Sequence, residues 1–326
     1  MAPLGAWLAA GDEPRVSRVR LVHVLSENWT LTPPRDLRAL VRMAQEAEDA
    51  GFDAVMVSEH IVLGRGADAD GRMPNPRDYA LPGNQDPAMP WPSSLVILSA
   101  VASVTTTLRL AAAAIIAPLR HPLLVAKDLA TLDLLAQGRL VVLPTVSWHE
   151  PEYGALGVAF GDRGALLDEH LAAWRAAWGS SPASFAGDHY RFEDVWVEPK
   201  PWRPGGVRLW FGSSTLHERL LGRIVRYGHG WNPLGSPSDE DVDRLRRALV
   251  EAGRDVDAFE LVGGTRGRFP DADSVADLDE ALATIPAQVD RGFTSICIKP
   301  SQFLDDPSRH AAWCREVVAK VADLAQ

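Results

Sequence analysis

Cysteine is scarce in this chain. Only two occur in 326 residues, Cys297 and Cys314, and they lack the paired spacing that zinc sites and disulfide frameworks need. We therefore expect no metal site, and two free thiols fit a reducing cytoplasm. No window approaches the roughly 18 unbroken apolar residues of a membrane span, and the apolar segment 1–10 lacks the basic region of a signal peptide. The sequence thus predicts a cytoplasmic protein.

Blocks of like charge are also absent. The chain has 33 basic and 43 acidic residues, for a formal net charge of -10, and this balance argues against a nucleic-acid groove or an anionic membrane surface. With 46% hydrophobic and 23% charged residues, the composition is that of a globular protein. We expect a small-molecule substrate, with no nucleic acid and no membrane as a partner.

Several catalytic motifs are missing as well. The sequence contains no G-x-S-x-G elbow, no P-loop, no H-E-x-x-H and no Asp/His cluster with metal spacing, so hydrolysis by serine or metal has no local support. The dinucleotide fingerprint G-x-G-x-x-G does not follow the first strand. An enzyme with these absences would take its chemistry from a cofactor.

Apolar strand-like runs alternate with helical segments along the chain. Leu108–Ala114, the helical segment Leu123–Ala136 and the run that begins at Gly138 form a βαβ unit, because buried parallel strands are continuously apolar. Eight such strands with no linker predict a single TIM-barrel domain, a (β/α)8 barrel over residues 1–326, with a doubly wound sheet as the alternative. The other expected strands are Val19–Leu25, Ala54–Ser58, Val207–Phe211, Gly230–Asn232, Phe259–Gly263 and Thr294–Ile298. The other expected helices are Arg35–Ala50, Ser93–Val104, Arg163–Trp178, Leu216–Tyr227, Asp239–Ala252, Val275–Asp290 and Pro307–Leu324.

Three segments interrupt this alternation. Residues 1–17 read as an N-terminal extension, and residues 64–92 form a long loop rich in Gly, Pro and Asp. Residues 183–199 resemble a hairpin insertion of aromatic and β-branched residues around Gly187 and Asp188. Together with residues 269–274, the long loop is expected to shape the substrate pocket.

Polar residues follow two of the expected strands. Ligands gather at the carboxyl ends of barrel strands, and His60 ends the second strand with Glu59 beside it to fix its tautomer. A surface histidine with a charged neighbour is the alternative. After the fifth strand, Gly212, Ser213 and Ser214 precede a helix start and could cradle a phosphate. The alternative there is an ordinary helix N-cap formed by Ser214 or Thr215.

Several segments in order resemble the luciferase-like monooxygenase family of flavin- and deazaflavin-dependent oxidoreductases. The resemblance covers roughly residues 19–300. The segments that carry it are 44–60, 116–122 with 127–133, 138–139, 148–157, 163–170, 185–192, 198–201, 210–214 and 227–231.

The resemblance implies a barrel with inserted loops that holds a flavin or deazaflavin ring in its mouth. It also implies a non-proline cis peptide behind the ring, at the position of Ala113 and Ala114. Carried over by position, His60 is the catalytic residue that approaches the ring. The cofactor-binding positions are Ala113, Ala114, Thr145, Ser147 and Trp148 around the ring and Gly212, Ser213 and Ser214 at the phosphate.

The chain departs from the family at the end of the fourth strand. Many relatives have glycine at the positions of Leu143, Thr145 and Ser147, and aspartate at that of His229. Pro144 cannot donate a ladder hydrogen bond, so the strand should end or bulge near it.

The resemblance leaves three functions open. The motif pattern is nearest to members that use the deazaflavin coenzyme F-420, which implies hydride transfer to or from a small organic substrate. The first alternative is an FMN-dependent monooxygenase that activates oxygen with reduced flavin from a partner reductase. The second is a flavin-binding barrel without catalysis. We expect a homodimer.

Overall fold

The strands of this protein close into a parallel barrel. The computed structural model describes residues 19–324, and the strand order around the barrel is β1-β10-β9-β8-β7-β4-β3-β2. The predicted (β/α)8 fold is therefore confirmed, and the predicted extension 1–17 lies outside the described residues. The barrel strands are β1 Arg20–Val24, β2 Ala54–Val57, β3 Arg109–Ile116, β4 Leu140–Thr145, β7 Arg208–Phe211, β8 Gly230–Trp231, β9 Glu260–Gly264 and β10 Ser295–Ile298.

Helices follow most of these strands. They are α1 Leu37–Ala50, α2 Ser94–Ala102, α3 Pro122–Leu135, α4 Glu150–Ala155, α5 Arg163–Ala177, α6 Glu218–Tyr227, α7 Asp239–Glu251, α8 Leu278–Leu282, α9 Ile285–Asp290 and α10 His310–Leu324. Within residues 19–324, no helix combines the length and the apolar character that crossing a bilayer requires.

The described chain divides into two compact units. Unit 1 consists of residues 112–259, and unit 2 consists of residues 19–111 and 260–324. In unit 2, β9, β10, β1 and β2 pair as parallel neighbours in that order. Val22 of β1 lies opposite Cys297 on one side and Ala54 on the other. This ladder holds the carboxyl ends of four strands at one edge.

Helix α1 shows how the sequence specifies its elements in unit 2. The carboxylate of Asp36 caps the helix by accepting from the backbone N–H of Ala39, and Gly51 ends it with a positive φ of 98° that glycine adopts at low cost. Leu40, Met43 and Ala47 are buried along one face, as the 3.6-residue period requires.

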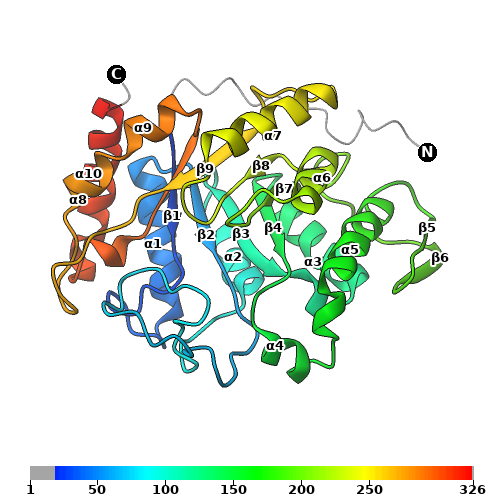
Figure 1. The fold of residues 1–326 in the computed structure, drawn as a ribbon, viewed down its shortest axis with the longest axis horizontal. Coiled ribbons are helices and arrows are strands. Elements are labelled where there is room, and N and C mark those ends of the chain that lie inside the picture. The colour runs from blue at the N-terminus through cyan, green and yellow to red at the C-terminus, as the bar shows by residue number, and fades with distance from the viewer. Residues whose placement is uncertain (1–18, 325–326) are drawn as a thin grey trace. The chain divides into compact units, whose positions relative to one another are not determined.

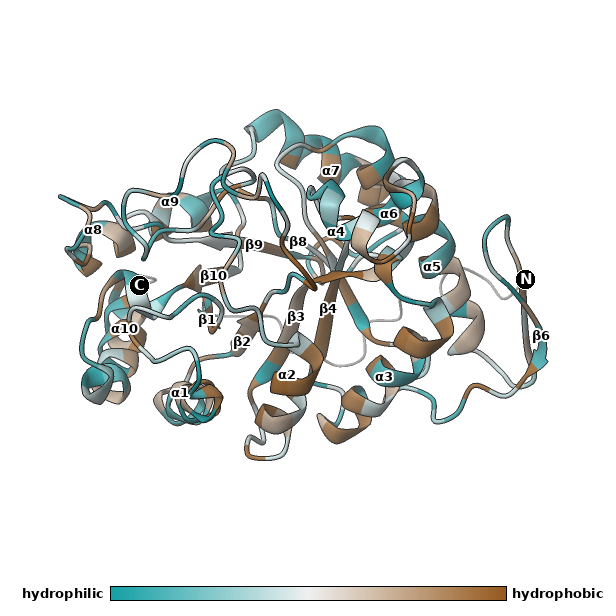
Figure 2. Cartoon of the chain, turned by 90° about the horizontal axis from the view of Figure 1, so that it is seen from below, coloured by the Kyte–Doolittle hydropathy of each residue, from teal (hydrophilic) through white to brown (hydrophobic). Residues whose placement is uncertain are grey.

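In unit 1, β4 and the β5–β6 hairpin follow their sequence patterns. Figure 2 colours β4 hydrophobic along its ribbon, and the strand ends at Thr145, directly after Pro144, as the missing proline N–H predicts. Strands β5 (Ala183–Ala186) and β6 (Arg191–Val195) form the expected hairpin. It lies beside α5 in Figure 1, and the Glu169 carboxylate of α5 accepts from the backbone N–H of Asp188 at 3.0 Å.

Several expected helices begin two or three residues later in the structure, and two differences affect the interpretation. The segment 275–290 contains two short helices, α8 and α9, because Pro286 has no N–H to bond to the carbonyl of Leu282. The helix expected from Leu216 begins at Glu218 instead. This second difference changes the interpretation of the preceding loop.

Candidate functional site

Two small residues lie near the carboxyl end of β3 in unit 1. Ala113 is buried, Ala114 is half-buried, and a cis peptide bond joins them. The bond expected from the family resemblance is therefore confirmed. The methyl side chains are small, as a position against a flat ring requires, and contact of such a ring with these two residues stays a prediction.

The end of β4 contributes three half-buried residues, Thr145, Ser147 and Trp148. Ser147 has a φ of 56°, which lies in the left-handed region that favours glycine. The glycine that the family resemblance implies at this position would fit the same backbone conformation. The Ser147 hydroxyl donates to Glu152 at 3.2 Å and accepts from the N–H of His149 at 3.4 Å. These bonds hold Ser147 in its conformation.

Tyr153 fixes the same loop from within unit 1. Its buried hydroxyl donates to the carbonyl of Val146 at 2.5 Å, and its ring meets Phe160 edge-on at 5.3 Å. Burial raises the pKa of Tyr153, although the charge of Arg163 opposes the shift. The phenol therefore stays protonated and acts as a fixed donor that positions residues 145–148.

The loop after β7 differs from the helix start expected there. His217 caps α6, and its Nδ1 accepts from the N–H of Leu220 at 3.2 Å, so the alternative that assigned Ser214 or Thr215 as N-cap is wrong. With Glu218 in its first turn, α6 offers little attraction to an anion. A phosphate would instead be held by the backbone and the hydroxyls of residues 212–214, of which Gly212 and Ser213 are half-buried and Ser214 is exposed.

Gly212 occupies a closely packed position. A Cβ atom there would lie 3.0 Å from the carbonyl oxygen of Asn232 and 3.3 Å from a methyl carbon of Leu143. A larger side chain at this position would require Asn232 or Leu143 to shift by a few tenths of an ångström, so an effect on the strands could not be separated from an effect on a ligand. The serine hydroxyls at positions 213 and 214 are therefore the better targets for testing a phosphate site.

Unit 2 contributes His60, which follows the end of β2. Its side chain is buried, so the alternative of a surface histidine is wrong, and the ring of Trp91 meets it edge-on at 5.2 Å. The neighbouring Glu59 carboxylate accepts from the hydroxyl of Ser94, the first residue of α2, at 3.0 Å. Burial and the edge-on contact with the Trp91 ring restrict the orientation of the imidazole.

Three further ionisable residues of unit 2 were not identified from the sequence: the buried Lys299 and the half-buried Glu27 and Tyr79. Lys299 follows β10 and is fully buried, and its Nζ lies 5.3 Å above the ring of Tyr79. Burial lowers the pKa of Lys299, and the charge of Glu27 opposes that shift. Burial raises the pKa of Glu27, which the charges of Lys299 and His60 oppose. The only signal in the sequence was a lysine placed directly after an apolar strand.

Burial also keeps the Tyr79 hydroxyl protonated. It raises the pKa of Tyr79 well above the ordinary range, and the charges of Cys297 and Glu27 add to the shift. In unit 2, the Glu27 carboxylate thus interacts electrostatically with both His60 and Lys299, and the Lys299 ammonium lies above the neutral phenol of Tyr79. Such a group of residues can bind a polar substrate and transfer a proton to or from it.

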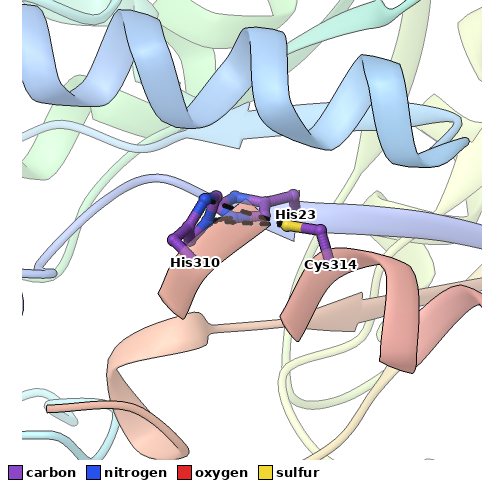
Figure 3. A group of neighbouring side chains, drawn as sticks. All are labelled: His23, His310 and Cys314. Atoms are coloured by element: carbon purple, nitrogen blue, oxygen red, sulfur yellow. Dashed lines mark hydrogen bonds between the residues drawn. The ribbon is translucent and has the colours of Figure 1, made fainter. Parts of the chain in front are cut away.

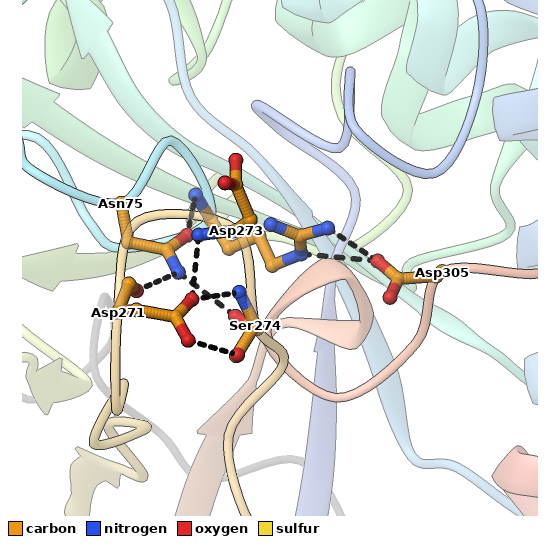
Figure 4. Close-up of polar contacts among 6 residues, drawn as sticks. Asn75, Asp271, Asp273, Ser274 and Asp305 are labelled. Atoms are coloured by element: carbon orange, nitrogen blue, oxygen red, sulfur yellow. Dashed lines mark hydrogen bonds and ion pairs between the residues drawn. The ribbon is translucent and has the colours of Figure 1, made fainter.

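The long loop 64–92 is tied to the other segment expected to shape the pocket. Figure 4 shows the amide of Asn75 donating to the backbone carbonyls of Asp271 and Ser274, at 3.0 and 2.8 Å. Arg77 pairs with Asp305, and Arg266 makes a bidentate pair with Asp78. These bonds hold Asp78, and with it Tyr79, beside Lys299, whose Nζ donates to the Asp78 carbonyl at 3.4 Å.

Sequence comparison places most of the chain in one family. The family described as luciferase-like monooxygenase matches residues 21–295. An uncharacterized protein of Mycobacterium tuberculosis is 34% identical over 219 residues, which are 65% of this chain and 74% of that protein.

Two other proteins show the range of relatives and neighbours. Pyrimidine monooxygenase RutA of Escherichia coli is 29% identical over 177 residues, 52% of this chain and 48% of RutA, so the match spans about half of that enzyme. Among solved structures, the coenzyme F-420-dependent tetrahydromethanopterin reductase of Methanopyrus kandleri has a TM-score of 0.64 at 14% identity, covering 93% of this chain and 99% of that one. The latter likeness is one of fold.

Proposed function

Because this chain belongs to the luciferase-like monooxygenase family, we propose that it is an oxidoreductase that uses coenzyme F-420 for hydride transfer to or from a small organic substrate. The observation that carries the proposal is the set of small and hydroxyl-bearing residues at three strand ends of unit 1, those of β3, β4 and β7. When bound, the deazaflavin ring supplies a carbon that donates or accepts hydride.

The residues of unit 1 fit such a cofactor. Ala113 and Ala114 would support the flat ring, and Thr145, Ser147 and Trp148 would border it. Gly212, Ser213 and Ser214 would hold the phosphate through backbone N–H groups and hydroxyls. The fit rests on side chains that are small or half-buried and on a loop that Tyr153 and Glu152 hold in place.

The residues of unit 2 would act on the substrate. The buried imidazole of His60 would orient the reacting group and supply or take a proton at a ring nitrogen. Lys299 and Glu27, each favouring the charged form of the other, would bind a polar oxygen of the substrate. Tyr79 would donate a hydrogen bond, because its phenol stays protonated.

An FMN-dependent monooxygenase is the second candidate function. The observation that favours it is the similarity to RutA, whose name is that of a pyrimidine monooxygenase. In that case a separate flavin reductase would be the partner of this chain. A flavin-binding barrel without catalysis is the third candidate, and the fully buried Lys299 argues against it, since a scaffold gains little from burying such a group.

A pair of turnover assays distinguishes these functions. Under anaerobic conditions, reduced F-420 is mixed with the protein and a panel of small ketones, enones and quinones, and its oxidation is followed by absorbance. In parallel, FMN, a flavin reductase and NADH are supplied in air, and substrate-dependent oxygen uptake is measured. The proposal expects turnover only in the first assay. Turnover only in the second would establish the FMN alternative.

We further propose that the protein acts in the cytoplasm as a homodimer. Both cysteines are buried free thiols, which suits a reducing compartment. Fractionation of cells that produce the protein and sedimentation velocity of the purified chain test the two statements separately.

A further inference from the structure

We propose that His23, His310 and Cys314 of unit 2 form a binding site for one thiophilic metal ion, with Zn²⁺ as the best match. The site is separate from the residues discussed above; the three side chains would supply three ligands of a tetrahedral site, with water as the fourth, and the bound ion would stabilise unit 2. Nothing in the spacing of the sequence indicated it, because His23 lies 287 positions from His310.

Three buried nitrogen and sulfur donors converge on one point. Figure 3 shows His23 on β1 pointing toward His310 and Cys314, which lie one turn apart on α10. The Nε2 atoms of the two histidines are 2.8 Å apart, and Cys314 Sγ lies 3.6 Å from His310 Nε2. All three side chains are buried, and their ligand atoms lie within 4.8 Å of one another.

Glu46 of α1 prepares His310 to act as a ligand. Its carboxylate lies 2.6 Å from His310 Nδ1, so the ring carries its proton on Nδ1 and presents a bare lone pair at Nε2. This arrangement of carboxylate, histidine and open nitrogen is the one that orients histidines in metal sites. Without a metal, the single lone pair on His310 Nε2 faces both the N–H of His23 and the thiol of Cys314.

The donor spacing is close to that of a zinc site. Bonds of about 2.0 Å to nitrogen and about 2.3 Å to sulfur in a tetrahedral site place donor atoms roughly 3.3–3.6 Å apart. The sulfur–nitrogen distance of 3.6 Å already matches. The two imidazoles, at 2.8 Å, would have to separate by about half an ångström. A rotation of the His23 ring on its strand suffices for a change of this size.

Charge and burial are compatible with a bound dication. Burial lowers the pKa of both histidines, so their rings are neutral and able to bind a metal at pH 7. Burial raises the pKa of the Cys314 thiol, and a metal would displace its proton to solvent. The thiolate and the Glu46 carboxylate together would then balance the two positive charges of Zn²⁺.

The surroundings explain what such an ion would do. The ring of Phe52 meets His23 edge-on at 5.5 Å, and Trp313 lies 6.0 Å from the His310 ring, so the site is apolar on these sides. Glu46, whose side chain is 39% exposed, marks the route by which an ion would enter. A bound ion would join β1 to the C-terminal helix α10 and thereby stabilise unit 2.

The test is metal binding by the full-length protein, purified under reducing conditions and freed of metal with a chelator. Co²⁺ is used as a spectroscopic substitute for Zn²⁺ and titrated into the protein. We expect one Co²⁺ per chain, with a near-ultraviolet thiolate-to-cobalt band and visible bands of tetrahedral type that Zn²⁺ abolishes. Zn²⁺ should also raise the melting temperature by several degrees.

Two cysteine variants locate the ligand. Cys314→Ser should lose the thiolate-to-cobalt band, whereas Cys297→Ser, which changes the other buried cysteine of unit 2, should retain it. His310→Gln should weaken binding at least about tenfold. The proposal is overturned if wild-type protein binds neither ion stoichiometrically, a result that needs no variant to fold. It is equally overturned if Cys314→Ser keeps the band or Cys297→Ser loses it.

Discussion

A buried ion cluster at the amino ends of four strands of unit 2 yields a quantitative prediction. Glu260 begins β9, and its carboxylate receives a bidentate pair of hydrogen bonds from Arg109 at 2.9 and 3.0 Å. Arg20 lies 3.5 Å away, and the hydroxyl of Ser295 also donates to Glu260. Residues at this end of a barrel serve stability rather than catalysis.

The size of the effect follows from the pKa of Glu260. Burial alone would raise this pKa, but Arg109, Ser295 and Arg20 outweigh burial and bring it to about 2, from an ordinary value of 4.5. A difference of about 2.5 pKa units, at about 1.4 kcal/mol each, stabilises the folded protein by about 3 kcal/mol at pH 7. Because the folded pKa is depressed, this contribution is complete above about pH 4.5 and declines as the pH falls toward 2.

We therefore expect Glu260→Gln to lower the free energy of unfolding by about 3 kcal/mol at pH 7, since two arginines lose their counter-charge. The measurement is urea denaturation of wild type and variant at pH 7 and pH 3. At pH 3 the difference should shrink to about 1 kcal/mol. Glu251→Gln, at an exposed position on α7, is the control and should change stability by less than about 0.5 kcal/mol. A loss equal to that of the control, or one that is the same at both pH values, would refute the reasoning.

Three further predictions concern the candidate site and its support. His60→Ala should slow turnover by about 100-fold or more with cofactor affinity nearly unchanged, and unchanged turnover would remove His60 from the reaction. Replacing both Ser213 and Ser214 by alanine should weaken cofactor binding about tenfold or more, whereas Ser238→Ala, at the N-cap of α7, should not alter it. Burial raises the pKa of Asp133 to about 6 from 3.8, so protonation of Asp133 should contribute about 2 kcal/mol of stability on acidification from about pH 6 to pH 4. Asp133→Asn should abolish that part of the pH profile in urea denaturation.

The sequence was sufficient for the architecture because the signals for it are local. The apolar run that forms β4 is continuous, Gly51 ends α1 where the apolar period stops, and Gly187 with Asp188 marks the hairpin turn. Even the end of β4 followed from one residue, Pro144. Each of these features depends on a few neighbouring positions, so the pattern alone was informative.

Sequence reasoning failed at two kinds of position. At one, an unusual residue caps a helix; at the other, a residue's partners lie far away in the sequence. The α6 start depends on the His217 ring as a cap, a role that serine or threonine usually fills. Lys299 and Glu27 are separated by nearly the whole chain, and only the barrel makes them part of one electrostatic group. His23 and Cys314 were assigned no role for the same reason. Residue type at a strand end can suggest a site, but side-chain partners across the fold are not encoded in local spacing.

The most direct test of the central claim is an equilibrium titration of the purified wild-type protein with oxidised coenzyme F-420 and, separately, with FMN. Binding of F-420 is followed by the change in its fluorescence, and FMN is then added as a competitor. The account predicts one F-420 site per chain, an affinity for F-420 at least about tenfold above that for FMN, and weaker binding by the Ser213 and Ser214 double variant. Tighter binding of FMN, or no binding of either cofactor, would contradict it.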